Sequence, residues 1–248
     1  MIQVGVSLAI FFILTTAYYL LKHFFIDKQR LWFTNIANLF LISYLFLVVG
    51  SQLVINVMNS ADHCNGAPQF GTAFMYTILP NILIFGLVLM VMQILPGWKA
   101  PFSNTIGYLF VWLGGAEDAY KDLIKNGKSP LISRILDNKS TIINEMTPFN
   151  FSAFMSRMAK EGVLKNNYKN NSSYNDLFNY VLAKDTIAEL VWVLVTGILV
   201  IISSFNSLID IQCDIPTKQK QAVAAKFKAE MAKINADKPK EKYFTKHD

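Results

Sequence analysis

Four long apolar stretches constrain this sequence more than any other feature. They cover residues 2–21, 31–57, 73–95 and 190–209, and none of them contains Asp, Glu, Lys or Arg. An α-helix rises 1.5 Å per residue, so about 20 residues cross a bilayer core of roughly 30 Å. The sequence therefore predicts an all-α polytopic membrane protein with four transmembrane helices.

The first stretch also has the length range of a secretory signal peptide. It lacks a basic segment at its start, however, and no clear small-residue cleavage site precedes Lys22. We therefore expect an uncleaved anchor. A short basic turn with Lys22, His23, Lys28 and Arg30 follows it.

The distribution of charge divides the rest of the chain. Charged residues make up 16% of the sequence, below the quarter that is typical of soluble domains, and they gather between and after the apolar stretches. We expect a membrane domain at 1–115 that holds the first three spans, and a small helical extramembrane domain at 116–184. The fourth span then lies within 185–213, and a basic tail occupies 214–248.

The segment after the third stretch is the most unusual part of the sequence. Pro96 and Gly97 end the span, which predicts an irregular break over 96–104. The apolar run 104–115 is too short to cross a bilayer, and its aromatic side chains suit the headgroup region. We expect a re-entrant or interfacial helix here. An ordinary buried helix of the following domain is the alternative.

Polar side chains interrupt the second and third spans. Asn35 and Asn38 are three residues apart and share a helix face, and Gln52 and Asn56 follow them. We interpret these polar residues as hydrogen-bond partners of neighbouring helices, with a polar pathway as the alternative. Pro80 predicts a kink in the third span, which serves packing or marks a gate.

Two further patterns concern the extramembrane domain. Apolar residues recur at helical spacing and predict a buried face rather than a ligand site. This stripe consists of Phe151, Phe154, Met155 and Met158. Asp185 and Glu189 are interpreted as acids at the N-terminus of the fourth helix, where the helix dipole favours them.

The tail 214–248 is rich in lysine, with nine Lys and five acids. Its apolar residues are spaced four, four and three apart and predict an amphipathic basic helix that docks on a partner. The docking residues are Val223, Phe227, Met231 and Ile234, with Lys226 and Lys228 beside them. A solvated helix is the alternative. Specific nucleic-acid binding is not expected, because the tail has no Arg and its acids dilute the Lys.

No catalytic or metal-binding pattern stands out. The chain has three His, and the pair His63-Cys64 is isolated from other metal ligands. Glu117 and Asp118 are adjacent, so they do not share a helix face as an acid/base pair needs. The sequence therefore predicts no enzyme, no cofactor and no metal site.

Four spans place both termini and the loop 59–72 on one side of the membrane. Cys64 lies in that loop and Cys213 lies just after the fourth span, so both are expected near the same membrane surface. A disulfide needs alpha carbons about 5.5 Å apart, which packing of the spans allows. We expect this bridge, with two free thiols as the alternative.

Orientation follows from the basic residues near the membrane. About six Lys and Arg lie on the side of 22–30 and 96–189, against about four on the tail side. The positive-inside rule then places the extramembrane domain toward the cytosol and the cysteines on the opposite side, where disulfides persist. The sequons at Asn138, Asn150, Asn170 and Asn171 all lie in 96–189, so none should be glycosylated.

Residues 60–115 resemble a viral family. The loop 64–72 reads CNGAPQFGT, and the third span is followed by PGW at 96–98 and PFSNTIGY at 101–108. This sequence is similar to membrane-embedded proteins of nucleocytoplasmic large DNA viruses, of the phycodnavirus and mimivirus kind. The resemblance implies a structural virion protein in the inner membrane beneath an icosahedral shell. It implies contacts with major and minor capsid proteins, and residence in a host internal membrane during assembly.

Three functions therefore compete. The first is a minor capsid protein that anchors the inner membrane to the overlying capsid lattice. The second is an accessory assembly subunit of an organellar membrane complex. The third is a small transporter or channel, which Pro80 and the Asn face of the second span favour. Transport is weakened because charged groups are missing from the interior of the apolar stretches. We expect the first function.

Overall fold

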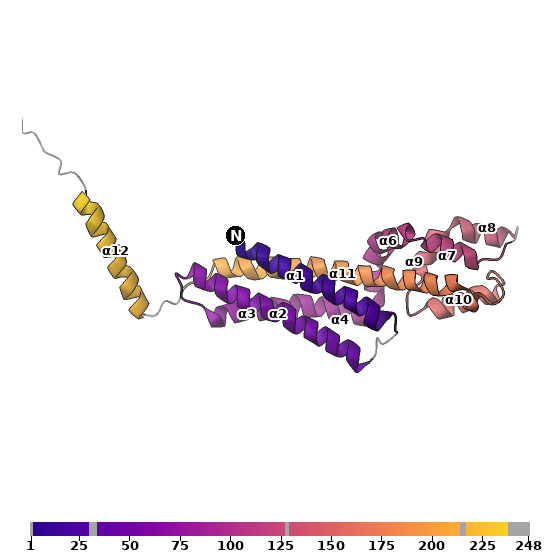
Figure 1. The fold of residues 1–248 in the computed structure, drawn as a ribbon, viewed down its shortest axis with the longest axis horizontal. Helices are drawn as coiled ribbons and strands as arrows, with labels where there is room; N and C mark the ends of the chain where they lie inside the picture. Colours follow the sequence, from indigo (N-terminus) through magenta and orange to yellow (C-terminus); the bar gives the residue numbers. More distant parts are fainter. Residues whose placement is uncertain (1, 30–33, 127–128, 214–216, 238–248) are drawn as a thin grey trace, which may run out of the picture.

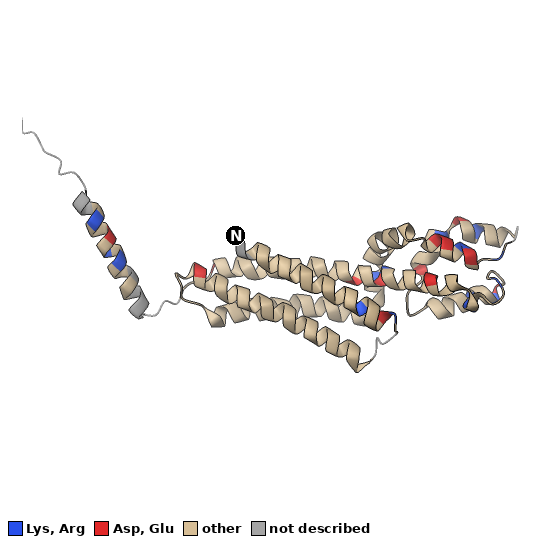
Figure 2. Cartoon of the chain, viewed as in Figure 1, with Lys and Arg blue, Asp and Glu red and all other residues tan. Residues whose placement is uncertain are grey.

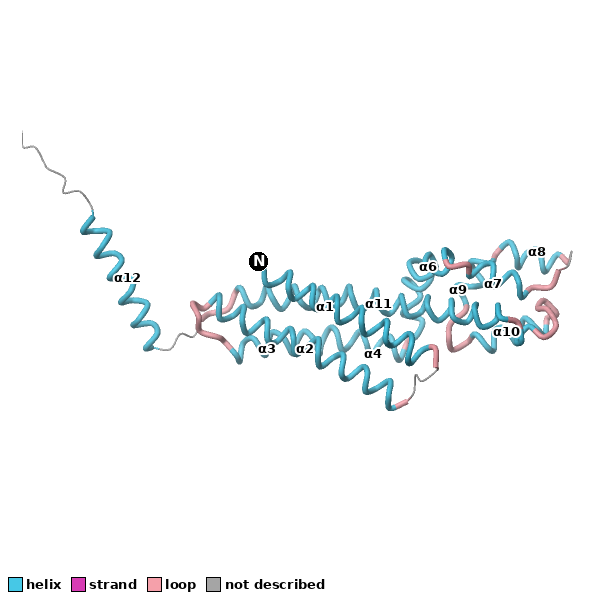
Figure 3. The backbone as a smooth tube through the Cα atoms, in the orientation of Figure 1, coloured by secondary structure: helices cyan, strands magenta, loops and turns pink. Residues whose placement is uncertain are grey.

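The protein is an elongated helical bundle with a smaller helical domain at one end (Figure 1). The computed structural model describes residues 2–29, 34–126, 129–213 and 217–237. Every regular element within these residues is a helix, and the one strand-like pairing among them is an isolated bridge between Ile124 and Leu164 (Figure 3). The described part of the chain therefore confirms the predicted all-helical class.

Four helices are long and apolar enough to cross a membrane, which confirms the predicted number and indicates an integral membrane protein. They are α1 (Ile2–Leu21) with its π-helical continuation η1 (Lys22–Asp27), α2 (Asn35–His63), α3 (Phe70–Pro80) with the π-helical η2 (Asn81–Gly86) and α4 (Leu87–Ile94), and α11 (Ser172–Ile209). Two bounds differ from expectation. Helix α2 continues to His63, and α11 begins 18 residues before the predicted start at 190. Residues 31–33 of the predicted second span lie outside the described residues.

Helix α11 is the centre of the bundle and contacts α1, α2 and α3. The close approach of α1 depends on Gly197, because a Cβ there would lie 2.0 Å from the ring of Phe11. Phe11 in turn packs edge-on against Phe85, with ring centroids 6.3 Å apart. The outer faces carry large exposed apolar side chains such as Phe46, and Figure 2 shows the middle of the bundle free of charge. Both features suit contact with lipid tails.

Two buried polar residues of α2 bond to the third span. Asn81 donates to the Gln52 side chain at 3.0 Å, and Asn56 donates to the Thr77 hydroxyl at 2.8 Å. The interpretation as interhelical hydrogen bonds is confirmed for Gln52 and Asn56. Asn35 and Asn38, by contrast, are both exposed.

Pro80 changes the helix type within the third span. Proline lacks a backbone N–H, so the carbonyl of Tyr76 loses its usual partner four residues later. Ser204 on α11 donates its hydroxyl to that carbonyl at 2.6 Å, and the chain continues beyond Pro80 as the π-helical η2. A hydroxyl from a neighbouring helix thus satisfies the group that the proline releases, as proline in a membrane span requires. Pro80 therefore acts here as a packing device.

Leu95 departs from helical angles at the end of the third span. The chain then forms η3 (Pro96–Lys99), α5 (Ala100–Phe102), η4 (Ser103–Gly107) and α6 (Tyr108–Leu113) in succession. The irregular break expected over 96–104 is therefore wrong, because these residues are helical and the interruption lies at Leu95. Gly107 lies against α11, where a Cβ would come within 2.6 Å of the Lys184 carbonyl oxygen. One face of α6 joins the domain core through Val111, while Leu109 and Phe110 on the other face are exposed.

The extramembrane domain is built from four short helices and the first half of α11. The short helices are α7 (Ala116–Leu123), α8 (Pro130–Asp137), α9 (Lys139–Glu145) and α10 (Phe151–Lys160). Phe151 and Met155 are buried in the domain core, and Phe154 and Met158 pack against it, so the Phe/Met stripe is core as predicted. Leu177 and Val181 of α11 lie in the same core, so α11 continues without a break through the expected boundary between residues 184 and 185.

The opposite end of the bundle is closed by a covalent link. Cys64 and Cys213 form a disulfide with alpha carbons 5.4 Å apart, which confirms the predicted bridge. Beyond it, α12 (Thr217–Asp237) projects away from the bundle in Figure 1. The tail is therefore helical over these residues, as expected.

Candidate functional site

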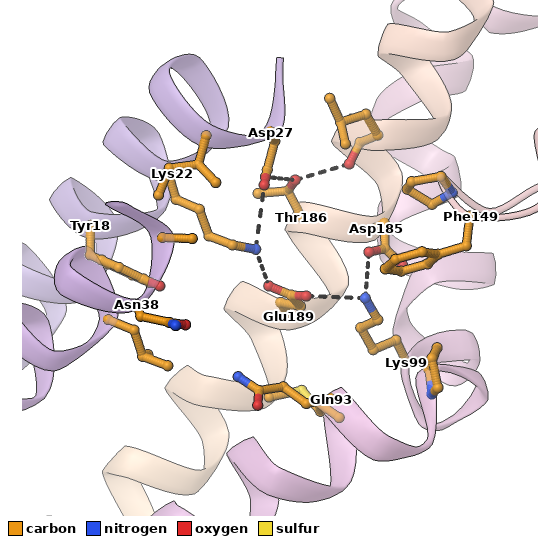
Figure 4. A pocket seen from close by; sticks show the side chains of 17 residues that line it. Tyr18, Lys22, Asp27, Asn38, Gln93, Lys99, Phe149, Asp185, Thr186 and Glu189 are labelled. Atoms are coloured by element: carbon orange, nitrogen blue, oxygen red, sulfur yellow. Dashed lines mark hydrogen bonds and ion pairs between the residues drawn. The ribbon is translucent and has the colours of Figure 1, made fainter. Parts of the chain in front are cut away.

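A pocket of about 350 Å³ lies where the bundle meets the extramembrane domain. Its charged side is formed by η1, η3 and the middle of α11, and its other walls come from the start of α2, the end of α4 and the loop at 148–149 (Figure 4). The volume is at the lower end of the range for small-ligand sites. Five charged side chains line this pocket, and we treat it as the candidate site.

A chain of ion pairs of alternating sign runs along the pocket. Lys22 Nζ lies 2.5 Å from Glu189 Oε2, and Lys99 Nζ lies 3.0 Å from Glu189 Oε1. Lys99 also pairs with Asp185, and Lys22 Nζ lies 3.8 Å from Asp27. Glu189 thus bridges the two lysines, and Figure 4 shows the five side chains converging from three segments. Ion pairs at low dielectric are strong only when every member is paired, as these are.

The surrounding structure fixes the positions of these charged groups. Thr186 directly follows Asp185 on α11 and lies about one turn before Glu189, and its hydroxyl lies 3.1 Å from Asp27 Oδ2 and 2.9 Å from the Leu182 carbonyl oxygen. The π-helical winding of η1 continues the first span and carries Lys22 and Asp27 to the pocket. Asp27 is 2% exposed, so its carboxylate depends on protein partners rather than on water.

Lys99 has the most constrained side chain of the site outside the spans. It is 4% exposed, and burial alone lowers the pKa of an ammonium group. The neighbouring carboxylates of Glu189 and Asp185 outweigh that effect and raise the pKa of Lys99 above its ordinary value. Lys99 is therefore a fixed cation at all physiological pH values.

Aromatic side chains mark the level of the pocket relative to the membrane. Trp98 and Trp192 lie with ring centroids 5.8 Å apart, and the indole of Trp192 donates to the Trp98 carbonyl at 3.1 Å. Tryptophan collects at the membrane–water boundary. The 18 residues from 192 to 209 complete α11 and rise about 27 Å, close to the thickness of a bilayer core. Glu189 and Asp185 then lie one and two turns beyond this boundary, at the level of the lipid headgroups.

Two expectations about these charged residues are wrong. Asp185 and Glu189 do not begin a helix, because α11 starts at Ser172 and they lie well inside it. Lys22 and His23 do not lie in a turn, because the helix of the first span continues through η1, and Lys22 pairs with Glu189. The sequence did contain one sign of this site, because each of these charged residues stands at the end of an apolar run. Only the fold shows that these ends meet.

A second network of charges lies in the extramembrane domain. Tyr108 donates to Glu117 at 2.6 Å, and Lys139 lies 3.1 Å from the same carboxylate. The Tyr108 hydrogen bond, with help from Lys139, lowers the pKa of Glu117. Glu117 therefore ties α6, α7 and α9 together.

The residues expected to carry function do not meet in one place. The tail residues Phe227, Met231 and Ile234 are exposed at 63%, 42% and 50% on α12, and the side chain of Val223 lies outside the described residues. Lys226 and Lys228 are exposed on the same helix. Cys64 and Cys213 lie together at the far end of the bundle from the pocket. Among the described residues, no group of His, Cys, Asp and Glu is arranged to hold a metal ion.

Comparison of the chain with protein-family models, with curated proteins and with solved structures gives no significant match. The resemblance to membrane proteins of large DNA viruses therefore rests on residues 60–115 alone.

Proposed function

We propose that this protein is a structural membrane protein that fixes a helical domain at a set height and angle above a bilayer. The observation that supports this most is helix α11. Its 38 residues form one uninterrupted helix, about 57 Å long, that serves both as the last span and as a core element of the extramembrane domain. A domain built on a continuous helix does not swing on a linker. Such rigidity suits a link between a membrane and an ordered protein layer.

Residues 60–115 resemble membrane proteins of large DNA viruses, and this resemblance suggests where the protein performs the structural role. In that setting the protein is a minor capsid protein of a virion, and it anchors the inner membrane to the overlying capsid lattice through major and minor capsid proteins. Under the four-span topology the extramembrane domain and the tail lie on opposite sides of the membrane. The domain then provides the surface for these capsid contacts, and the exposed Phe227, Met231 and Ile234 of the tail provide a surface for a partner on the other side. This proposal includes no enzymatic activity and no cofactor.

The direct test is to locate the protein in purified particles and to identify its neighbours by cross-linking mass spectrometry. A chain that lacks residues 217–248 should still insert its spans but should incorporate less well, because none of the described residues covers Phe227, Met231 and Ile234 of α12. A second variant keeps the helix of the tail but replaces Phe227, Met231 and Ile234 by Gln, so that it tests the apolar side chains alone. Incorporation equal to the full chain for both variants would contradict the docking role. Recovery in an organellar complex would instead support the accessory-subunit alternative.

The charged pocket favours transport as a second candidate function, because ionisable groups near a membrane often mark an ion path. The pocket, however, lies at one end of the bundle. Further along, the described polar groups of the spans bond to one another, as Gln52 does to Asn81 and Asn56 to Thr77. We therefore expect no ion flux through the protein in liposomes. Flux above that of empty liposomes would reverse this preference.

A further inference from the structure

Exposed residues of two spans line the pocket, from which we infer that it opens between these spans. Asn38 near the start of α2 and Gln93 near the end of α4 line it, and both side chains are exposed (Figure 4). Figure 1 shows the N-terminal half of α2 diverging from α4 on this side. The aromatic pair Trp98–Trp192 places this opening at headgroup depth. A molecule in the headgroup layer of the bilayer can therefore reach the pocket without crossing the hydrocarbon core.

The lining of the pocket separates into a charged side and an apolar side. Asp27, Lys22, Glu189, Lys99 and Asp185 form the charged side, and Leu41 and Met92 are among the apolar lining. A ligand with a single charge meets both signs in turn along this alternating row. A ligand that carries both signs a few ångströms apart matches it. The chains of a lipid would lie beside the apolar lining.

The lysines have hydrogen-bonding capacity left for such a ligand. An ammonium group has three donors. The hydrogen bonds of Lys99 go to Asp185 and Glu189, and that of Lys22 goes to Glu189. Each carboxylate can likewise accept more than one hydrogen bond. The row can therefore receive a phosphate and an ammonium group without losing its internal pairs.

We propose that the pocket binds the headgroup of an aminophospholipid, with its phosphate beside Lys22 and Lys99 and its primary ammonium beside Asp185 and Glu189. A primary ammonium donates hydrogen bonds to carboxylates, whereas the trimethylammonium of a choline headgroup has no N–H to donate. The pocket of about 350 Å³ takes the headgroup, and the acyl chains remain in the bilayer. This inference is independent of the proposed structural role.

The test measures lipid binding to the full-length protein by native mass spectrometry in mixed micelles. The lipids share acyl chains and carry phosphoethanolamine, its N-methyl and N,N-dimethyl forms, phosphocholine or phosphoglycerol. Affinity should fall as N–H donors are removed, and phosphocholine should bind roughly tenfold more weakly than phosphoethanolamine, because charge-assisted hydrogen bonds are lost. Phosphoglycerol, which lacks the ammonium, should also bind weakly. Equal affinity for all headgroups would overturn the proposal.

Variants of the protein then test whether the lipid headgroup binds in this pocket. Asn38→Trp closes the opening and should remove the preference for phosphoethanolamine. Asn35→Trp is the matched control, because Asn35 lies one turn away on the same helix and does not line the pocket. The double variant Lys22→Gln with Glu189→Gln removes one positive and one negative charge and leaves Lys99 paired with Asp185, and it should also lose the preference. A preference that survives both changes contradicts this site. Equal binding of water-soluble glycerophosphoethanolamine would identify a free solute, not a lipid, as the ligand.

Discussion

The two ends of the four-helix bundle are held by different chemistry. At the domain end, Lys22 and Lys99 share Glu189, and the groups come from the first span, the segment after the third span and α11. At the tail end, one disulfide joins Cys64, at the end of α2, to Cys213, just after α11. The domain end contains no described cysteine. The tail end has a covalent link where the domain end has ion pairs.

The predicted orientation puts the disulfide on the side away from the cytosol. Disulfides persist in oxidising compartments and are rare in the cytosol. Ion pairs need no oxidising environment and form on either side. The comparison also shows that each end is closed by residues that are far apart in the sequence and that the four-span topology brings to one membrane surface.

The largest effect is expected at the domain end. Replacement of Glu189 by Ala leaves Lys22 and Lys99 without their shared partner, because both ammonium groups lie within 3.0 Å of its carboxylate. We expect a loss of about 3 kcal/mol in the free energy of unfolding, near the low end for breaking a buried ion pair because these side chains are not fully enclosed. Denaturation in detergent micelles measures it. The double variant Lys22→Met with Glu189→Met should recover part of the loss. If the single variant were as stable as the wild type, the ion pairs would not hold this end.

A smaller effect is expected at the tail end. Replacement of Cys64 and Cys213 by Ser removes a link across 149 residues. We expect a loss of about 2 kcal/mol, the low end for native disulfides, because the inserted spans already hold the two ends of the loop near each other. Reductant should have the same effect on the wild type and none on the double Ser variant. Complete alkylation of both thiols before reduction would show that the bridge is not formed in the membrane.

Acid should weaken the extramembrane domain and spare the tail end. Asp122 on α7 accepts hydrogen bonds from Ser173 at 2.7 Å and from Asn171 at 2.8 Å, and Lys165 lies at 3.0 Å. These bonds, with Ser173 contributing most, lower the pKa of Asp122 from 3.8 to about 2. A lowered carboxyl pKa stabilises the fold above the unfolded value, and this stabilisation is lost as the pH falls from about 4 to about 2.

The variant Asp122→Asn serves as the control for this pH dependence. It should be less stable than the wild type at pH 7, and the difference should shrink between pH 4 and pH 2. The measurement is hydrogen exchange of α7 and of the start of α11, recorded during thermal unfolding to compare the stability of the two proteins. A difference that stays constant over this range would exclude Asp122 as the titrating group.

For glycosylation we expect no effect, so the mass of the protein should stay unchanged. Asn138, Asn150 and Asn170 are exposed in the extramembrane domain, and Asn171 lies half-buried at the start of α11. If this domain faces the cytosol, expression in a eukaryotic cell should give a protein whose mass does not change with glycosidase. A glycosidase-sensitive shift would invert the orientation and place the disulfide on the cytosolic side.

The number of spans could be predicted from the sequence because it depends on the local hydrophobicity of each segment. The disulfide could be predicted because an even number of spans puts both cysteines on one side of the membrane. An apolar run of about 20 residues has few alternatives to a membrane helix, since every backbone polar group must bond internally in lipid. Four such runs put the loop with Cys64 and the end of α11 with Cys213 on one side. The stripe of Phe151 and Met155 likewise followed from helical spacing, and both side chains are buried in the domain core.

The pocket and the continuity of α11 could not be predicted in this way. Local pattern placed Asp185 and Glu189 at a helix start, because acids are favoured there. The tertiary structure instead extends the helix back to Ser172, since Leu177 and Val181 find cover in the domain core. Lys22, Lys99 and Glu189 are separated by 77 and 90 residues of sequence, and only the packing of α1 and η3 on α11 brings them together. The sequence alone determined which segments enter the membrane, because that depends on each segment's own hydrophobicity. The tertiary structure decided which charges meet at its surface, because that depends on how the segments pack.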